Sequence, residues 1–251
     1  MSFDKSLESE IKNILSQGPI AGLAGGEELM SSTGDTFDVK DPGSGEKLAE
    51  VHNLQAEDVD RAVELAGQAF ENAEWAGLPV NERCVYLHRL ADEVENRKPL
   101  ISHLESMDCG KILVQAEDDV QNFIDTMRYF ADLAQNTQLR TVLAVKGHEA
   151  AYARHPWGVC GSIVPWNFPF LLCGWGIAPA LAAGNTVVVK PAEDTPLTTL
   201  YLARMVKEIG FPDGVVNVVP GLGAVTGAAL SANPKLSRMS FTGSPEVGRL
   251  V

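Results

Sequence analysis

The chain has 251 residues, of which 45% are hydrophobic and 21% are charged, as is ordinary for a soluble globular protein. That length allows one large domain or two small ones with a proper core. The 20 basic and 33 acidic residues give a formal net charge of −13. Such a surface would repel phosphate backbones and anionic lipid headgroups, and no segment approaches the ~20 continuous apolar residues of a membrane span. We therefore expect neither nucleic acid nor membrane among the partners.

Cysteine and histidine usage indicates the compartment and argues against a metal site. The four cysteines form no CxxC pair and no metal-ligand spacing with the five histidines. We therefore expect no bound metal and a reducing, cytoplasmic location.

The first 140 residues predict an irregular arm followed by short strands and helices. Residues 18–36 are rich in Gly and Ser and predict a loop, the end of an N-terminal arm of residues 1–36. Asp41 to Gly45 predicts a turn between two short strands at 37–40 and 47–51. Apolar residues at helical spacing then predict three helices, at 56–70, around 87–94 and around 120–131.

The rest of the chain predicts an α/β fold. Residues 141–157 predict two strands joined around Lys146-Gly147. Strand and helix then alternate four times, with strands expected at 159–164, 186–190, 215–219 and 238–242, and helices at 170–183, 196–209, 224–232 and from 244 onward. Val-rich strands separated by helices of this length predict a doubly wound, Rossmann-like parallel sheet with helices on both faces.

Polar and glycine residues follow each predicted strand, at 165–167, 190–193, 220–223 and 242–244. Ligands of doubly wound sheets bind beyond the carboxyl ends of the strands, so these clusters predict the binding site. Gly243-Ser244 lies where a strand turns into a helix, and free N–H groups there suit a pyrophosphate; a simple N-cap serine is an equal alternative. The glycines at 221, 223 and 227 have the spacing GxGxxxG, not GxGxxG, and are a weak signal alone.

Lys190 and Glu193 follow the second strand of this region. The lysine can donate to the two hydroxyls of a ribose and the glutamate can accept from them, and the carboxylate would repel a 2′-phosphate. This pattern favours NAD over NADP; a surface Lys–Glu pair is the alternative.

Asn167 lies between Trp166 and Phe168, in an apolar setting. A neutral amide N–H₂ among apolar residues suits an oxyanion site. On these residues alone, a buried turn asparagine satisfied by the backbone is the simpler interpretation.

Residues 158–248 resemble the coenzyme-binding core of the aldehyde dehydrogenase superfamily. The resemblance runs through PWNFP, IAPALAAGNTVVVKPAE, TPLT, GFPDGVVNVV and FTGS, and more weakly upstream through DPGSGEKLAEV and the segment 108–111. It covers most of the chain from about Phe37 to the end. Motifs of this length and order are highly specific.

The resemblance implies NAD as cofactor and an aldehyde as substrate. It implies that Asn167 holds the oxyanion, that Lys190 and Glu193 clamp the adenosine ribose, and that the remaining site residues line or support the dinucleotide groove: Trp166, Gly223, Ser244, Val247, Ile163, Val164 and Pro165. Residues 37–140 would be the N-terminal part of the coenzyme-binding domain and 158–251 its NAD-binding core. The segment 141–157 would be an oligomerisation hairpin, hence a homodimer or homotetramer.

Two departures from the family pattern affect the expected activity. Gly176 stands where many members carry a lysine, which puts a proton relay through that position in doubt. The family's nucleophilic cysteine and general-base glutamate would lie beyond Val251, so we expect the catalytic domain to be absent and this chain to be inactive alone. Cys173 lies on an apolar helix without a neighbouring base, and core packing is its expected role.

Two other functions are compatible with these residues. An acylating member of the superfamily would pass the acyl group to coenzyme A or phosphate. A non-catalytic protein would bind NAD or pair with a full-length relative.

Overall fold

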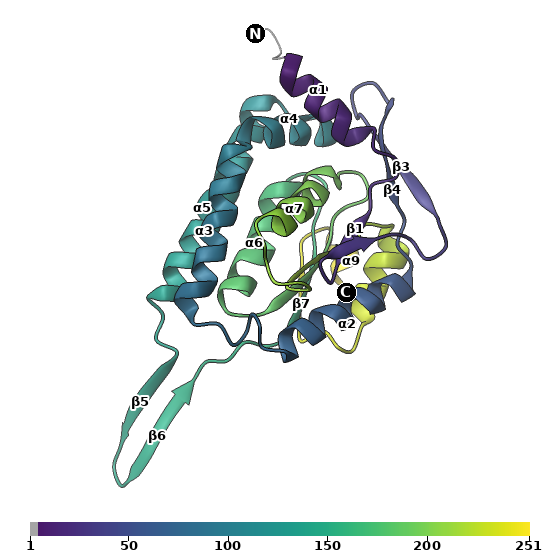
Figure 1. The fold of residues 1–251 in the computed structure, drawn as a ribbon. Helices are drawn as coiled ribbons and strands as arrows, with labels where there is room; N and C mark the ends of the chain where they lie inside the picture. The colour runs from purple at the N-terminus through teal and green to yellow at the C-terminus, as the bar shows by residue number, and fades with distance from the viewer. Residues whose placement is uncertain (1–4) are drawn as a thin grey trace.

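The computed structural model describes residues 5–251, and its centre is a six-stranded sheet in the order β10-β7-β8-β9-β1-β2 (Figure 1). Strands β7 to β10 are parallel, whereas β1 is antiparallel to both β9 and β2. The bounds are β7 (Val159–Ile163), β8 (Thr186–Lys190), β9 (Val216–Val218), β10 (Arg238–Phe241), β1 (Gly22–Ala24) and β2 (Glu27–Leu29). All four predicted strands of the core are therefore confirmed, with small changes at their ends.

Helices cover both faces of this sheet, as the sequence predicts. Val187 and Val189 of β8 pack in one core cluster with α6 (Pro169–Ala182) and α7 (Leu197–Glu208). Val188, which points to the other face, packs in a second cluster with α2 (Ala56–Glu71) and α8 (Ala228–Ala232). Alternate side chains of one buried strand thus supply two cores, which is why the strand is almost uniformly apolar.

A helical layer packs against α6 on the side away from the sheet. It contains α3 (Val80–Asn96), α4 (Lys98–Cys109) and α5 (Leu113–Gln135), with α1 (Lys5–Leu15) at its upper end in Figure 1. The rings of Phe123 on α5 and Phe170 on α6 stack with centroids 4.3 Å apart. The predicted helices around 87–94 and 120–131 are the centres of α3 and α5, whereas α1 and α4 are not among the predicted helices. No helix within residues 5–251 is both long and apolar enough to span a bilayer.

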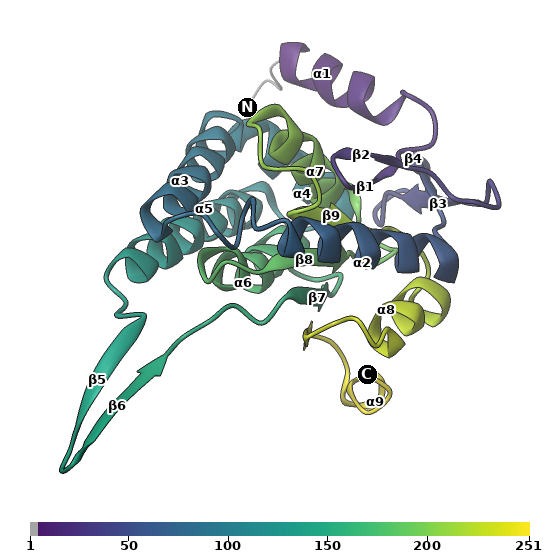
Figure 2. The ribbon, with the colours of Figure 1, turned by 60° about the horizontal axis from the view of Figure 1, so that its bottom comes forward.

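Two ribbons lie outside the main sheet. Strands β3 (Thr36–Lys40) and β4 (Lys47–His52) are antiparallel, as predicted. Strands β5 (Arg140–Val145) and β6 (His148–Ala153) form a hairpin that extends away from the body in both views (Figures 1 and 2). The hairpin is confirmed as a structure, but its second strand ends at Ala153 and not near residue 157.

The interpretation of residues 18–36 as a loop is wrong. Strands β1 and β2 form a tight hairpin whose two turn residues, Gly25 and Gly26, have φ of 59° and 79°. Two consecutive residues with positive φ are typical of the type I′ turn, which favours glycine. Gly22 lets β1 approach β9, because a Cβ there would lie 2.4 Å from the carbonyl oxygen of Val218. These glycines, which favour a loop in the sequence, thus permit two further strands beside β9.

The predicted helix at 224–232 is also different in detail. It begins as one π-helical turn, η1 (Gly223–Gly227), and continues as α8. The last helix, α9 (Pro245–Gly248), follows Ser244 as predicted.

Candidate functional site

The strand order places a switch point between β7 and β10. From β7 the chain moves through α6 to β8 and through α7 to β9, and then returns through α8 so that β10 lies on the other side of β7. Ligands of doubly wound sheets bind in the crevice outside the carboxyl ends of strands at such a reversal. In register, Ile163 lies opposite both Lys190 and Phe241. The segments that follow these three strands therefore meet at one edge of the sheet, as the sequence predicts.

Lys190, Glu193 and Gly223 are joined by direct contacts at this edge. Lys190 is 2% exposed, and its Nζ lies 2.7 Å from Oε2 of Glu193. The other carboxylate oxygen of Glu193 accepts from the amide of Gly223 at 2.9 Å. The Lys190 side chain is thus buried and held by Glu193, and it does not extend into solvent as the lysine of a surface Lys–Glu pair would.

Burial and pairing have opposite effects on these two charges. Burial lowers the pKa of Lys190 and outweighs the attraction of Glu193. Burial alone would raise the pKa of Glu193, but the Lys190 ammonium and the Gly223 amide together leave it below its ordinary value. The difference follows from exposure, because the Glu193 side chain retains 35% of its surface while Lys190 retains almost none. Glu193 is therefore a charged acceptor at the surface end of the pair.

The glycines of the weak GxGxxxG pattern have separate roles. Gly221 has φ 155°, and a Cβ there would lie 2.0 Å from Oγ1 of Thr226, which itself donates to the Leu54 carbonyl at 2.6 Å. That glycine is required by packing. Gly223 is exposed and contacts Glu193, and Gly227 packs near the stem of Lys190. Only part of the pattern therefore faces the candidate site.

Asn167 is exposed, in a turn whose flanking residues are held. Its side chain makes no hydrogen bond to any residue in the described range 5–251, so the interpretation as a buried, satisfied turn asparagine is wrong. Trp166 is 61% exposed, and its carbonyl accepts from Oγ1 of Thr195 at 3.2 Å. The Asn167 amide is thus free to donate to a ligand at the carboxyl edge.

Ser244 and Val247 are exposed at the end of β10. The Ser244 side chain accepts from the Val247 amide at 3.3 Å, so the serine is an N-cap, the alternative that the sequence left open. Pro245 has no N–H group, and the amides of Val247 and Gly248 donate to the side chain and the carbonyl of Ser244, so capping takes most of the N–H groups of the first turn. The pyrophosphate contact stays a prediction.

Ile163, Val164 and Pro165 form the transition from β7 to the turn. Val164 is buried, and its amide donates to the Lys190 carbonyl at 3.0 Å, which extends the β7–β8 pairing past the end of the strand. Ile163 and Pro165 are half-buried beside it. The three residues support the site and carry no charge.

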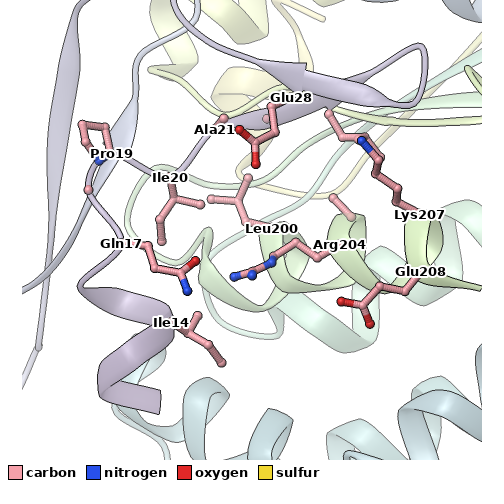
Figure 3. A pocket seen from close by; sticks show the side chains of 14 residues that line it. Ile14, Gln17, Pro19, Ile20, Ala21, Glu28, Leu200, Arg204, Lys207 and Glu208 are labelled. Carbon is pink, nitrogen blue, oxygen red and sulfur yellow. The ribbon is translucent and has the colours of Figure 1, made fainter. Parts of the chain in front are cut away.

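Two cavities differ in their relation to this site. One of about 410 Å³ is lined by Trp166 and Glu193, together with residues of β3 and the end of α4. The cavity in Figure 3, of about 450 Å³, lies between α1, the segment 17–22 and α7, and none of the predicted site residues lines it. Arg204 and Glu28 extend into it (Figure 3), yet half of its lining residues are exposed and its charged side chains are of both signs. The first cavity is therefore the one associated with the candidate site.

None of the four cysteines resembles an activated thiol. Burial raises the pKa of Cys173 to about 12, and its side chain is inaccessible. Burial likewise raises the pKa of Cys109 to about 11, with the Glu105 carboxylate adding to the shift, and burial also raises the pKa of Cys84 and Cys160. A thiol acts as a nucleophile in its thiolate form, so core packing is the supported role.

Gly176 packs closely against β7. A Cβ at this position would lie 2.5 Å from Oγ of Ser162, so any larger residue requires Ser162 to move. The space that a side chain at position 176 would need is thus occupied by Ser162.

Sequence reasoning missed the residues that support the turn around Asn167. Thr195 holds Trp166, and Glu105, Asp108 and Lys111 of the α4 region hold the first turns of α6 and α7. Charged residues among apolar ones at 100–111 could have indicated these contacts. Because α4 was not predicted, the sequence did not show that these side chains point toward the same part of the molecule.

Comparison with known proteins identifies the family of this chain. Residues 29–251 match the Aldehyde dehydrogenase family. The chain is 48% identical over 224 residues to retinaldehyde dehydrogenase 3 of Mus musculus and 46% identical over 224 residues to aldehyde dehydrogenase 1A1 of Homo sapiens. Each alignment covers 88% of this chain and 44% of the relative, so the chain spans less than half the length of these curated relatives.

Solved structures give the same result for the fold. Betaine aldehyde dehydrogenase of Staphylococcus aureus, in complex with NAD⁺, has a TM-score of 0.92 at 32% identity and covers 97% of this chain, which spans 48% of that one. The NAD⁺ complex of an aldehyde dehydrogenase from Bacillus cereus has a TM-score of 0.92 at 37% identity, over 96% of this chain and 49% of that one. The resemblance in the sequence is confirmed: this chain belongs to the aldehyde dehydrogenase family.

Proposed function

We propose that the carboxyl edge of β7, β8 and β10 binds NAD, with Lys190 and Glu193 on the adenosine ribose. The observation that carries the proposal is the linked set Lys190–Glu193–Gly223, which places a buried lysine and a partly exposed, charged acceptor at the carboxyl ends of β8 and β9, beside the switch point of the sheet. Two similar structures were solved in complex with NAD⁺, which supports the same cofactor here.

The Glu193 carboxylate is the selective element in this proposal. Its lowered pKa keeps it ionised at neutral pH, so it accepts from ribose hydroxyls and repels a 2′-phosphate. Trp166, Gly223, Ser244 and Val247 would line the dinucleotide groove, while Ile163, Val164 and Pro165 support it from β7. When bound, NAD supplies the hydride acceptor.

We further propose that the whole protein oxidises an aldehyde to a carboxylic acid. The Asn167 N–H₂ group would donate to the oxyanion that forms when a thiolate attacks the aldehyde carbon. The thiolate and the general base would come from residues outside these 251, since burial keeps all four cysteines protonated. This chain would then supply the cofactor site and half of the oxyanion hole.

The domain organisation and assembly are part of the same proposal. The β1–β2 hairpin belongs to the central sheet and so joins residues 37–140 and 158–251 in the coenzyme-binding domain, whereas 141–157 is an oligomerisation hairpin of a homodimer or homotetramer. Exposed Val142 and Tyr152 support the last point, because apolar side chains on a projecting hairpin favour a partner. Free cysteines throughout the described residues support a cytoplasmic location.

Calorimetric titration of the 251-residue chain with NAD and with NADP tests the cofactor site. We expect NAD to bind the more tightly, and Glu193→Ser to narrow the difference by improving NADP. A chain that prefers NADP contradicts the ribose assignment. The same chain should form no NADH from an aldehyde; turnover that disappears with Cys173→Ser would contradict the assignment of catalysis to residues elsewhere.

A further inference from the structure

The end of α4 and the start of α5 bring three buried charges together. Nζ of Lys111 forms an ion pair with Asp119 and lies 3.5 Å from Oε1 of Glu105. The side chains of Lys111, Glu105 and Asp119 are 8%, 0% and 6% exposed, respectively. These three residues are called the α4–α5 ion cluster below.

The local backbone brings Lys111 back toward α4. Gly110 ends the helix with φ 72°, a left-handed conformation that glycine adopts without strain. Ser106 Oγ then donates to the Lys111 carbonyl at 2.7 Å. Buried charges cost desolvation energy, and replacing a buried ion pair by apolar groups is often neutral or stabilising. Stability alone is therefore a weak explanation for this cluster.

The contacts that leave the cluster go to the first turns of α6 and α7. Oε1 of Glu105 accepts from the Phe170 amide at 3.3 Å, and Oε2 accepts from the Thr198 hydroxyl at 2.7 Å. Nζ of Lys111 lies 4.6 Å from the ring centroid of Phe168, a cation–π distance. Phe168 immediately follows Asn167, and Phe170 lies three residues after it.

Asn167 is thus flanked by residues held from two directions. The Trp166 carbonyl is fixed by Thr195 on the N-terminal side, and the cluster fixes Phe168 and Phe170 on the C-terminal side. The Asn167 side chain makes no hydrogen bond to the described residues and is exposed. A side chain in this arrangement owes its direction to its backbone.

We propose that the α4–α5 ion cluster positions Asn167 for oxyanion binding, by holding the first turn of α6 through Glu105 and the Phe168 ring through Lys111. The proposal rests on the proposed function of Asn167. Because Glu105 also holds Thr198 at the start of α7, the cluster couples the Asn167 turn to the segment that follows Glu193. Glu105, Lys111 and Asp119 are positioning residues, which act through the backbone of 168–170.

The test compares three variants. Glu105→Leu removes the acceptor of the Phe170 amide and leaves the Lys111–Asp119 pair intact. Glu105→Gln keeps an amide oxygen at the same place and should restore the hydrogen bond. Arg128→Met is the matched control, since Arg128 on α5 pairs with Asp92 and Glu95 at an exposed site, 2.8 and 2.6 Å away. If Glu105→Leu does not fold, the double variant Lys111→Met/Asp119→Leu removes the charge over Phe168 instead.

The first readout is amide hydrogen exchange of residues 168–172 in the 251-residue chain, which requires no activity. We expect Glu105→Leu to accelerate exchange of the Phe170 amide by about 10-fold or more, as a lost buried hydrogen bond implies. Glu105→Gln should restore protection, and Arg128→Met should leave it unchanged. Unchanged protection in Glu105→Leu overturns the proposal.

The second readout is steady-state kinetics of the complete enzyme that carries this chain. Misplacing the oxyanion donor should lower kcat by about 10- to 100-fold with little change in KM for NAD, and Glu105→Gln should recover most of it. Faster exchange with an unchanged kcat overturns the positioning role. If Asn167→Ala is then also without effect, the proposed function of Asn167 has failed as well.

Discussion

The two halves of the carboxyl edge are built differently. In the β8–β9 half, Lys190, Glu193 and Gly223 contact one another directly, and Lys190 is 2% exposed. In the β7–β10 half, Asn167 and Ser244 are exposed, and the first has no side-chain hydrogen bond to the described residues. The β8–β9 half is held by contacts among its own residues. In the β7–β10 half, the backbone on either side of Asn167 determines where its side chain lies.

This difference fits the two tasks proposed for the site. A site that recognises a stable group such as a ribose gains affinity when its donors and acceptors are fixed before binding, because less freedom is lost. A group that donates to a developing oxyanion must instead be free of partners in the ground state, so that its bond forms in the transition state.

A reactive thiol near the β7–β10 half would contradict this division, because that half would then contain a nucleophile as well as the oxyanion donor. Burial raises the pKa of Cys173 from the ordinary 9.0 to about 12, which lowers its thiolate population about 10³-fold at pH 8. We expect Cys173 to resist iodoacetamide in the folded chain and to react after denaturation. Intact-mass analysis with peptide mapping measures both states, and rapid native labelling of Cys173 contradicts the assignment.

Asn167→Ala separates the two halves by function. In the complete enzyme we expect turnover to fall by about 10²–10³, the usual loss for one oxyanion donor, with the affinity for NAD unchanged. Steady-state kinetics under chemistry-limited conditions and NAD titration measure the two quantities. An unchanged turnover would reduce Asn167 to a structural turn residue, while a parallel loss of NAD affinity would show that the halves are not independent.

The Lys190–Glu193 pair should respond asymmetrically to truncation. Glu193→Ala leaves a buried ammonium without its partner. Because Glu193 is 35% exposed and solvent screens its charge, this loss should lower the free energy of unfolding by only about 1–2 kcal/mol. Lys190→Met fills the same space, and the remaining carboxylate keeps the Gly223 amide and solvent, so its cost should be under about 1 kcal/mol. Urea unfolding measures both, and equal losses would contradict the burial argument.

The same pair predicts a pH dependence with a definite sign. The pKa of Glu193 is lowered in the folded chain, so its stabilisation is present above the ordinary value of 4.5 and is lost as pH falls through the lower folded value. Glu193→Gln should therefore flatten the acid side of the stability profile, whereas Ser244→Ala should not. Urea midpoints measured between pH 3 and 6, about 1.5 units either side of the ordinary value of 4.5, would show it.

The sequence predicts the residues at the carboxyl ends of the strands better than it predicts the buried residues that hold them. Lys190 and Glu193 are three residues apart after a Val-rich strand, so a local pattern is sufficient to pair them. Glu105 and Thr198 are far apart in the chain and meet only after α4 packs near α6 and α7. No spacing rule connects such residues.

The error at residues 18–36 has a similar cause. Gly25 and Gly26 have the conformation of a tight hairpin turn, but the strands on either side are only three residues long and contain little alternation. Their stability comes from β9, to which Leu23 is paired opposite Val218. Pairing with a partner almost 200 residues away overrides local composition, which is why the loop prediction failed.

The smallest effect is expected at Ser244, and it tests whether the β7–β10 half is held locally. Ser244→Ala removes the acceptor of the Val247 amide, a cap worth about 0.5–2 kcal/mol in typical helices. Because α9 is short and exposed, this loss should be confined to its own turn: the Val247 amide should exchange faster while the urea midpoint of the whole chain stays constant. Hydrogen exchange and urea unfolding on one preparation measure both, with Ser231→Ala, at a half-buried serine of α8 whose hydroxyl donates to the Ala228 carbonyl, as control. A clear drop in global stability would mean that α9 is part of the cooperative core. The division of the edge into a fixed half and a presented half would then fail.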